Sequence, residues 1–308
     1  MVKFKHTIMS LKIKKKIKLT RPTLIAAWPG MGNVAIGAIS YLRRKLNMVE
    51  IAEIDLSHIY YPDAILVEQG VGRLPDSPQS IFYASMEFPI VVYENEIQLG
   101  EAAGLSLINL ALDFAQHLEV KKIITVAAFP INSSYKDRSL VYGVGGSFSV
   151  LSELRQFGIQ ILDRGSISGL NGLFLGYSQK RGFETLCLLA TIPLYATNFI
   201  NPRAWRAILE VLENMLGVRI DLTELDQLVA EIDQKLEQIE MQVQTFIENQ
   251  KSTEEPDQVN PQILRRIEQL FIEARNNRDK ALELKRLLDR YNLFERYEDR
   301  FLDLFKKE

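Results

Sequence analysis

The glycine-rich segment at residues 29–33 comes closest, in residue types and spacing, to a recognisable chemistry. Gly30 and Gly32 follow an apolar run and Ala35 opens an amphipathic one, as in the turn that holds the pyrophosphate of a dinucleotide. The N–H groups at the start of a helix can hold an anion there. Three acids lie near the place, about twenty residues later, where such a site has its ribose-binding acid: Glu50, Glu53 and Asp55. Because each of the three matches, a nucleotide site and a tight structural turn both remain open.

The other residues able to do acid–base, nucleophilic or metal chemistry are scattered. The histidines have no metal-ligand spacing: His6, His58 and His117. Ser147 has no base beside it, and Glu94 and Glu96 follow an expected strand end, where an acid–base pair and a solvated loop are both open. Cys187 lies in an apolar run and is expected in the core. The sequence therefore predicts no catalytic residue, no metal site and no cofactor.

Composition places the chain among ordinary globular proteins. It has 308 residues, of which 47% are hydrophobic and 25% charged, enough for one or two domains. A net charge of −2 argues against a protein that binds nucleic acid through its overall charge. A single cysteine allows no internal disulfide, which indicates the cytoplasm. The sequence shows no secretory signal in its first twenty residues and no run of 18 apolar residues, so a membrane is not expected as a partner.

The first 22 residues are basic, with eight Lys or Arg and no acid. Four lysines alternate with apolar residues there: Lys12, Lys14, Lys16 and Lys18. This period of two predicts a strand with one solvated face, and lysines on such a strand discourage aggregation. A nucleic-acid contact is the alternative, but nucleic acid is not expected as a partner.

The hydrophobic pattern alternates between strands and helices. Strands are predicted at 24–28, 52–56, 65–68, 81–86, 90–93, 122–128, 159–161 and 182–190, and helices at 34–46, 101–117, 149–157 and 202–215. Glycines and prolines predict a loop at 71–80, and residues 131–147 are also expected to be loop. The strand–helix–strand unit at 90–128 implies a parallel crossover. We therefore expect an α/β fold, a mostly parallel central sheet with helices on both faces.

Beyond residue 221 the pattern becomes helical throughout. One seam has heptad spacing: Leu225, Val229, Ile232, Leu236, Ile239, Val243 and Phe246. A second follows a polar linker at about 249–260: Ile267, Leu270, Ala274, Asn277, Ala281, Leu284, Leu288 and Tyr291. We expect two domains, an α/β domain at 1–220 and an antiparallel helical hairpin at 221–308. A coiled-coil contact between copies is the alternative use of these seams.

Several segments together resemble the proteasome assembly chaperone 2 family. The first is Trp28-Pro-Gly-Met-Gly-Asn-Val-Ala, and the second is the glycine-rich stretch at 158–176. Others lie at 182–189, 201–204 and 216–222, so the resemblance spans about residues 10–245. The sequence departs from the family at Ala190-Thr191-Ile192, where members often have Gly-Glu-Thr. Chaperones that dock on the proteasome often end in a hydrophobic residue, tyrosine and any residue, whereas this sequence ends Phe305-Lys306-Lys307-Glu308.

The resemblance implies a phosphorylase-like layered fold and a binding or assembly protein rather than an enzyme. Its expected partners are proteins, such as proteasome-like subunits, and further copies of itself. The alternative is an enzyme or a binding protein with a phosphorylase-like pocket for phosphate or a nucleoside. In that alternative Gly30, Gly32 and Asn33 position an anion, and Gln98 or Asn171 reads a polar ligand.

Overall fold

The chain forms two compact units, Met1–Glu240 and Met241–Glu308. The structure, a computed structural model, describes residues 5–6, 9–253, 261–274, 278–291 and 293–304. None of the helices in these ranges is long and apolar enough to cross a membrane.

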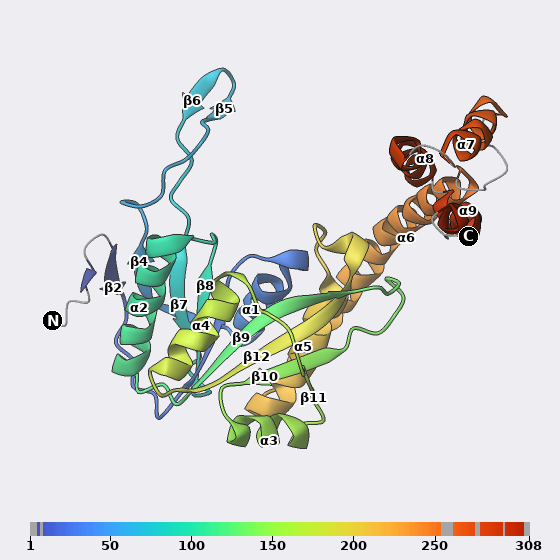
Figure 1. The fold of residues 1–308 in the computed structure, drawn as a ribbon. Coiled ribbons are helices and arrows are strands. Elements are labelled where there is room, and N and C mark those ends of the chain that lie inside the picture. The colour runs from blue at the N-terminus through green and yellow to red at the C-terminus, as the bar shows by residue number, and fades with distance from the viewer. Residues whose placement is uncertain (1–4, 7–8, 254–260, 275–277, 292, 305–308) are drawn as a thin grey trace. The chain divides into compact units, whose positions relative to one another are not determined.

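One large sheet organises the first unit (Figure 1). Its strands lie in the order β1-β2-β4-β7-β8-β3-β9-β12-β10-β11. Their bounds are β1 Lys5–His6, β2 Met9–Ile13, β3 Thr23–Ala27, β4 Val49–Asp55, β7 Ser80–Ala84, β8 Ile90–Asn95, β9 Lys122–Ile131, β10 Val141–Gly145, β11 Gln160–Ile161 and β12 Glu184–Pro193. The central strands β8, β3, β9 and β12 are parallel. On one side of these, the neighbouring strands β1, β2, β4, β7 and β8 pair antiparallel. On the other side, β10 is antiparallel to β12.

Helices cover both faces of this sheet. Their bounds are α1 Val34–Lys45, α2 Glu101–His117, α3 Phe148–Gln156, α4 Gly169–Lys180 and α5 Pro202–Leu216. Residues of α1, α3 and α5 share one apolar core with the sheet, and residues of α2 and α4 share the other. Each core forms because apolar residues recur along one side of each helix. The predicted α/β fold is therefore confirmed, with its parallel strands at the centre of the sheet.

Most predicted elements are present, including the crossover from β8 through α2 to β9, which passes over β3. Two regions differ from the prediction. The expected loop at 131–147 contains β10, which pairs with β12 from Val141 to Gly145. The segment at 71–80, also expected to be loop, begins with a strand: β5 Leu66–Glu68 and β6 Val71–Arg73 form a separate two-stranded hairpin. Figure 1 shows this hairpin extending away from the sheet between β4 and β7.

The helix α6, Thr223–Thr253, begins in the first unit and ends in the second. Leu225 is buried in the core under α1 and α5, and Ile232 and Leu236 pack with Tyr135 in a smaller cluster. The guanidinium of Arg203 donates hydrogen bonds to the carboxylate of Asp233. These contacts show that the first part of α6 packs on the sheet and belongs to the first unit.

The second unit contains α7 Pro261–Ala274, α8 Arg278–Arg290 and α9 Phe294–Asp303. Ion pairs of Arg266 with Glu283, at 2.7 Å, and of Lys280 with Glu273, at 3.7 Å, show that α7 and α8 run antiparallel. The helices α7 and α8 therefore form an antiparallel pair within this unit. The expected continuous helix through the second seam was wrong, although Ile267 and Leu284 are buried in one core as predicted. Asn277 and Phe305, and the side chain of Phe246, lie outside the described residues.

Candidate functional site

The turn after β3 lies at the edge where the parallel strands end, the usual place for ligands in α/β sheets. Met31–Asn33 form a single 3₁₀ turn that leads directly into α1. Gly32 has φ of +63°, and a Cβ there would lie 3.2–3.3 Å from the side chains of Val34, Asn201 and Ile192. Glycine is required at this position both by the left-handed backbone and by the close neighbours.

Hydrogen bonds attach this turn to the rest of the sheet domain. The N–H of Gly32 donates to the carbonyl of Thr197, at 2.8 Å, and the carbonyl of Gly32 accepts from the N–H of Asn201, at 2.9 Å. The indole of Trp205 donates to the same carbonyl, at 3.3 Å. The backbone groups of Gly32 are therefore used within the protein.

The two predicted amide residues brace the same turn from its other side. The Nε2 of Gln98 donates to the carbonyl of Pro29, at 2.7 Å, and its Oε1 accepts from the N–H of Leu170, at 2.9 Å. The Oδ1 of Asn171 accepts from the N–H of Trp28, at 3.1 Å, and Asn171 is buried. Both side chains therefore bind backbone groups just after β3. The sequence does not reveal these contacts, because Gln98 and Asn171 lie 69 and 143 residues from their partners.

A small hollow beside the turn has a volume of about 240 Å³. Gly30, Gly32 and Asn33 line it together with residues from the segment that follows β12: Thr197, Asn198 and Phe199. The structure therefore brings three of the five predicted ligand residues to one hollow, whereas Gln98 and Asn171 are not part of its lining. Asn33 and Gly30 are exposed at its mouth.

The three acids considered as ribose ligands lie on β4, which two strands, β7 and β8, separate from β3. The Nζ of Lys12 lies 2.7 Å from a carboxylate oxygen of Asp55, and Lys14 pairs with Glu50 and Glu53. The hydrogen bond from Lys12 lowers the pKa of Asp55. The dinucleotide interpretation was wrong in this respect, because the acids are across the sheet from the turn and are paired with lysines.

The other candidate reactive residues are separate and have structural contacts. Burial raises the pKa of Glu94, which accepts a hydrogen bond from Nε of Arg43 at 2.8 Å. The hydroxyl of Ser147 accepts from the N–H of Val150 and caps α3. Cys187 is fully buried as predicted, and burial raises the pKa of its thiol to about 12. Among the described residues, no three or more His, Cys, Asp or Glu gather as they would around a metal ion.

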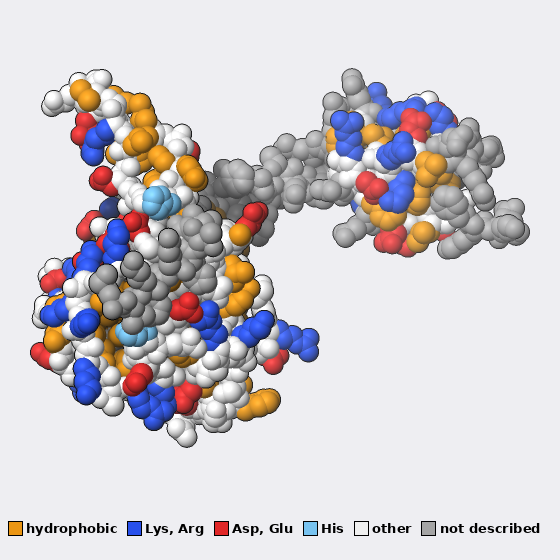
Figure 2. Space-filling model, turned by 90° about the vertical axis from the view of Figure 1, so that its left-hand side faces the viewer, with side chains coloured by type: hydrophobic (Ala, Val, Ile, Leu, Met, Phe, Trp, Pro, Cys, Tyr) orange, Lys and Arg blue, Asp and Glu red, His pale blue; other side chains and the backbone are white. Residues whose placement is uncertain are grey.

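A larger exposed feature is the projecting hairpin, whose residues 63–74 we call the arm. Every residue of the arm is exposed, and hydrophobic side chains gather along it (Figure 2). The apolar ones are between 44% and 68% exposed: Ile65, Leu66, Val67, Val71 and Leu74. The apolar run at 65–67, next to a segment rich in glycine and proline, is the feature of the sequence that corresponds to this exposed surface.

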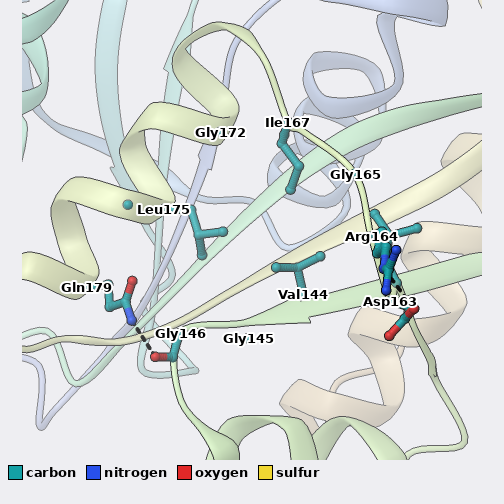
Figure 3. A pocket seen from close by; sticks show the side chains of 12 residues that line it. Val144, Gly145, Gly146, Asp163, Arg164, Gly165, Ile167, Gly172, Leu175 and Gln179 are labelled. Carbon is teal, nitrogen blue, oxygen red and sulfur yellow. Dashed lines mark hydrogen bonds and ion pairs between the residues drawn. The ribbon is translucent and has the colours of Figure 1, made fainter.

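A second hollow lies between β10 and α4, and we call it the groove (Figure 3). Its volume is about 620 Å³. The side chains of Val144, Ile167 and Leu175 point into it, and glycines form much of its wall. Asp163 and Arg164 lie at its rim, where both are almost fully exposed. The sequence did not indicate the groove, because its residues come from three separate segments, at 144–146, 162–167 and 172–179.

Comparison with known proteins agrees with this architecture. An uncharacterized protein of Methanocaldococcus jannaschii is 24% identical over 227 residues, which are 73% of this chain and 88% of that protein. The structure of Pyrococcus furiosus PbaA, described as an archaeal homolog of proteasome-assembly chaperone, is 25% identical with a TM-score of 0.60. The match covers 77% of this chain and 98% of PbaA.

A second solved structure shares the fold. Pyrococcus furiosus PbaB, described as an archaeal proteasome activator, is 21% identical with a TM-score of 0.64, covering 76% of this chain and all of PbaB. The model of the PAC2 family matches residues 24–240, which include β3 from its second residue and every later strand of the sheet. The resemblance found in the turn after β3 and in the glycine-rich stretch at 158–176 is thereby confirmed, and this chain belongs to the PAC2 family.

Proposed function

We propose that this chain is a non-catalytic assembly protein of the cytoplasm that acts through protein–protein contacts. The observation that carries this proposal is the arm, a hairpin of exposed apolar side chains on a protein of the PAC2 family. Exposed apolar surface of this kind marks a place where another protein binds. The residues considered for catalysis or ligand binding support the same proposal, since they are dispersed, and Glu94, Gln98 and Asn171 have hydrogen-bond partners within the protein.

The proposed partners are subunits of a proteasome-like protease. Two solved relatives support this choice, one described as a homolog of a proteasome-assembly chaperone and the other as a proteasome activator. Self-association is proposed as well, since an apolar arm on every copy offers a contact that each copy can make. The fold alone does not carry the choice of partner, because one fold hosts many functions.

The test is capture of partners by the full chain from a lysate of its native host, with every captured protein identified by mass spectrometry. The matched control is the variant Ile65→Ser/Val67→Ser, which removes two exposed apolar side chains of the arm. The proposal expects proteasome-like subunits on the wild-type chain and at least a tenfold reduction on the control. Equal capture by both chains, or capture of no protease subunit, would contradict it.

A second candidate function is binding of a small anion such as phosphate or a nucleoside phosphate. The hollow lined by Gly30, Gly32 and Asn33 favours it, because it lies at the N-terminus of α1. Thermal unfolding with increasing phosphate, nucleosides and nucleotides tests it. A saturable rise in Tm that is lost in Asn33→Asp, which adds a negative charge at the hollow, supports an anion site. No shift with any of these compounds removes this candidate.

A further inference from the structure

The arm is a two-stranded hairpin without a partner inside its own chain. Isolated hairpins are marginally stable, and they need a third strand or a packed face to persist. The register pairs Val67 with Gly72, so Ile65, Val67 and Leu74 alternate onto one face. A Cβ on Gly72 would lie 2.8 Å from Ile65, which places Ile65 on that face too. One face of the arm is thus entirely apolar, while Glu68 and Arg73 belong to the other.

The groove has the properties that would receive such a strand. Its floor is aliphatic, from Val144, Ile167 and Leu175. β11 pairs with β10 only at Tyr142 and Gly143, so the outer edge of β10 is uncovered at Gly145. The N–H of Gly146 donates to Thr185 of β12, and the alternation of the ladder therefore turns the N–H and C=O of Gly145 outward. Glycines along the wall allow a close backbone approach.

The arm cannot reach the groove of its own chain. The strands β8, β3, β9 and β12 separate β7 from β10, a distance of roughly 24 Å at ~4.8 Å per strand. The arm leaves the sheet where β8 ends, since Ser80 pairs with Asn95. The groove lies at the opposite edge, because Gly145 pairs with Leu186 near the start of β12. A contact between the two features must therefore join different copies.

The area of the arm fits a weak contact between two copies. An extended chain exposes about 1.45 Å² per dalton, so twelve residues exposed to about 60% present roughly 1,100 Å² over both faces. One face contributes about half of this, which corresponds to the low end of specific interfaces, below the standard ~800 Å² from each partner. The charges do not oppose the contact, since the arm carries the pair Glu68 and Arg73 and the rim of the groove carries the pair Asp163 and Arg164.

We propose that the arm of one copy of this chain seats in the groove of a second copy, with its apolar face toward Val144, Ile167 and Leu175. The inference rests on the proposed function and names the contact through which self-association occurs. Because the arm and the groove are different surfaces, the contact is head-to-tail, and each copy both donates an arm and accepts one.

The first test measures the mass of the full chain by light scattering over a series of concentrations. Gly176 lies on α4 in the wall of the groove, and a Cβ there meets no atom within 4 Å. Gly176→Trp should therefore fill the groove without strain and weaken self-association at least tenfold, with Tm unchanged or raised. The matched control is Leu173→Trp, which places the same indole on an exposed position of α4 outside the groove and should leave the association unchanged.

The second test uses engineered cysteines, for which the only native thiol, Cys187, is buried. Chains with Val67→Cys and chains with Gly176→Cys are oxidised separately and as a mixture. The proposal expects a covalent dimer in the mixture and little in either chain alone. A covalent dimer of Val67→Cys alone would show that two arms pack on each other, which overturns the proposal.

Two further results would also count against a contact between the arm and the groove. A chain that is monomeric at about 100 μM overturns the proposal, as does self-association that Gly176→Trp leaves unchanged. Both tests use the purified chain alone. Their failure is therefore distinguishable from failure of the proposed function, which the capture of protease subunits from the host measures separately.

Discussion

The turn after β3 and the arm both lie at the edge where the parallel strands end, yet they are built in opposite ways. The turn has glycine motifs that suggest chemistry, but its backbone groups and both bracing amides are used within the protein. The arm has no motif, and its apolar side chains are left exposed. The difference teaches that a glycine motif can be required by the fold alone. The surface available to another protein is found where apolar side chains have no packing partner in their own chain.

The largest effect is expected at the turn, from Gly32→Val. The substitution forces a β-branched residue into a left-handed backbone and against three side chains at 3.2–3.3 Å. We expect a loss of about 3 kcal/mol or more in the free energy of unfolding, measured by chemical denaturation of the first unit. Gly70→Ala is the control, because Gly70 also has a positive φ but has nothing within 4 Å of its Cβ position. Equal losses in both variants would show that crowding at the turn is unimportant.

The next largest effect is expected from Asn171→Ala. The change removes the acceptor for the buried N–H of Trp28 and leaves that group without a partner. An unsatisfied buried donor costs about 2 kcal/mol, which should appear as a fall in Tm. Asn171→Asp keeps the acceptor oxygen and tests whether the hydrogen bond or the packing matters. If Asn171→Ala unfolds at the wild-type temperature, the turn does not depend on this brace.

A smaller, pH-dependent effect is expected at the base of the arm, from Asp55→Asn. Hydrogen bonds from Lys12 and from Ser57 lower the pKa of Asp55 in the folded chain. The stabilisation is therefore present above the unfolded pKa of about 4 and is lost as the pH falls toward the folded value. Asp55→Asn should lower stability by about 1 kcal/mol at pH 7, and the difference from the wild type should close as the pH is lowered. A difference that stays constant with pH would contradict this assignment.

The smallest effect on stability is expected in the arm itself. Val67→Ser exchanges an apolar side chain that is 63% exposed, and such surface changes usually alter stability by less than about 0.5 kcal/mol. Denaturation of the wild type and of the variant at micromolar concentration should give the same midpoint. A large loss of stability in Val67→Ser would erase the contrast between the arm and the turn, because the arm would then be packed against its own chain.

The sequence predicted most of the elements because their patterns are local. Helix α2 was predicted with the bounds that the structure shows, since its apolar positions recur within one continuous segment. Leu105, near the start of that helix, is 38% exposed although it is apolar. The strand β10 was missed because its glycines resemble a loop, and its pairing depends on a strand more than forty residues away.

The candidate site was less predictable than the fold. Gly30, Gly32 and Asn33 do line one hollow, because they are neighbours in the sequence. The roles of Gln98 and Asn171 depend on which backbone groups lie near them, and only the tertiary structure shows that these are Trp28 and Pro29.

The position of β12 in the sheet constrains the order in which the strands can pair during synthesis. β12 lies between β9 and β10, both of which precede it in the chain. During synthesis those earlier strands must therefore wait, with their edges open, until residues 184–193 have been made. Contacts between residues so distant in sequence slow folding and expose strand edges to aggregation. A ribosome that pauses before this strand is complete would hold the nascent chain at its most vulnerable stage.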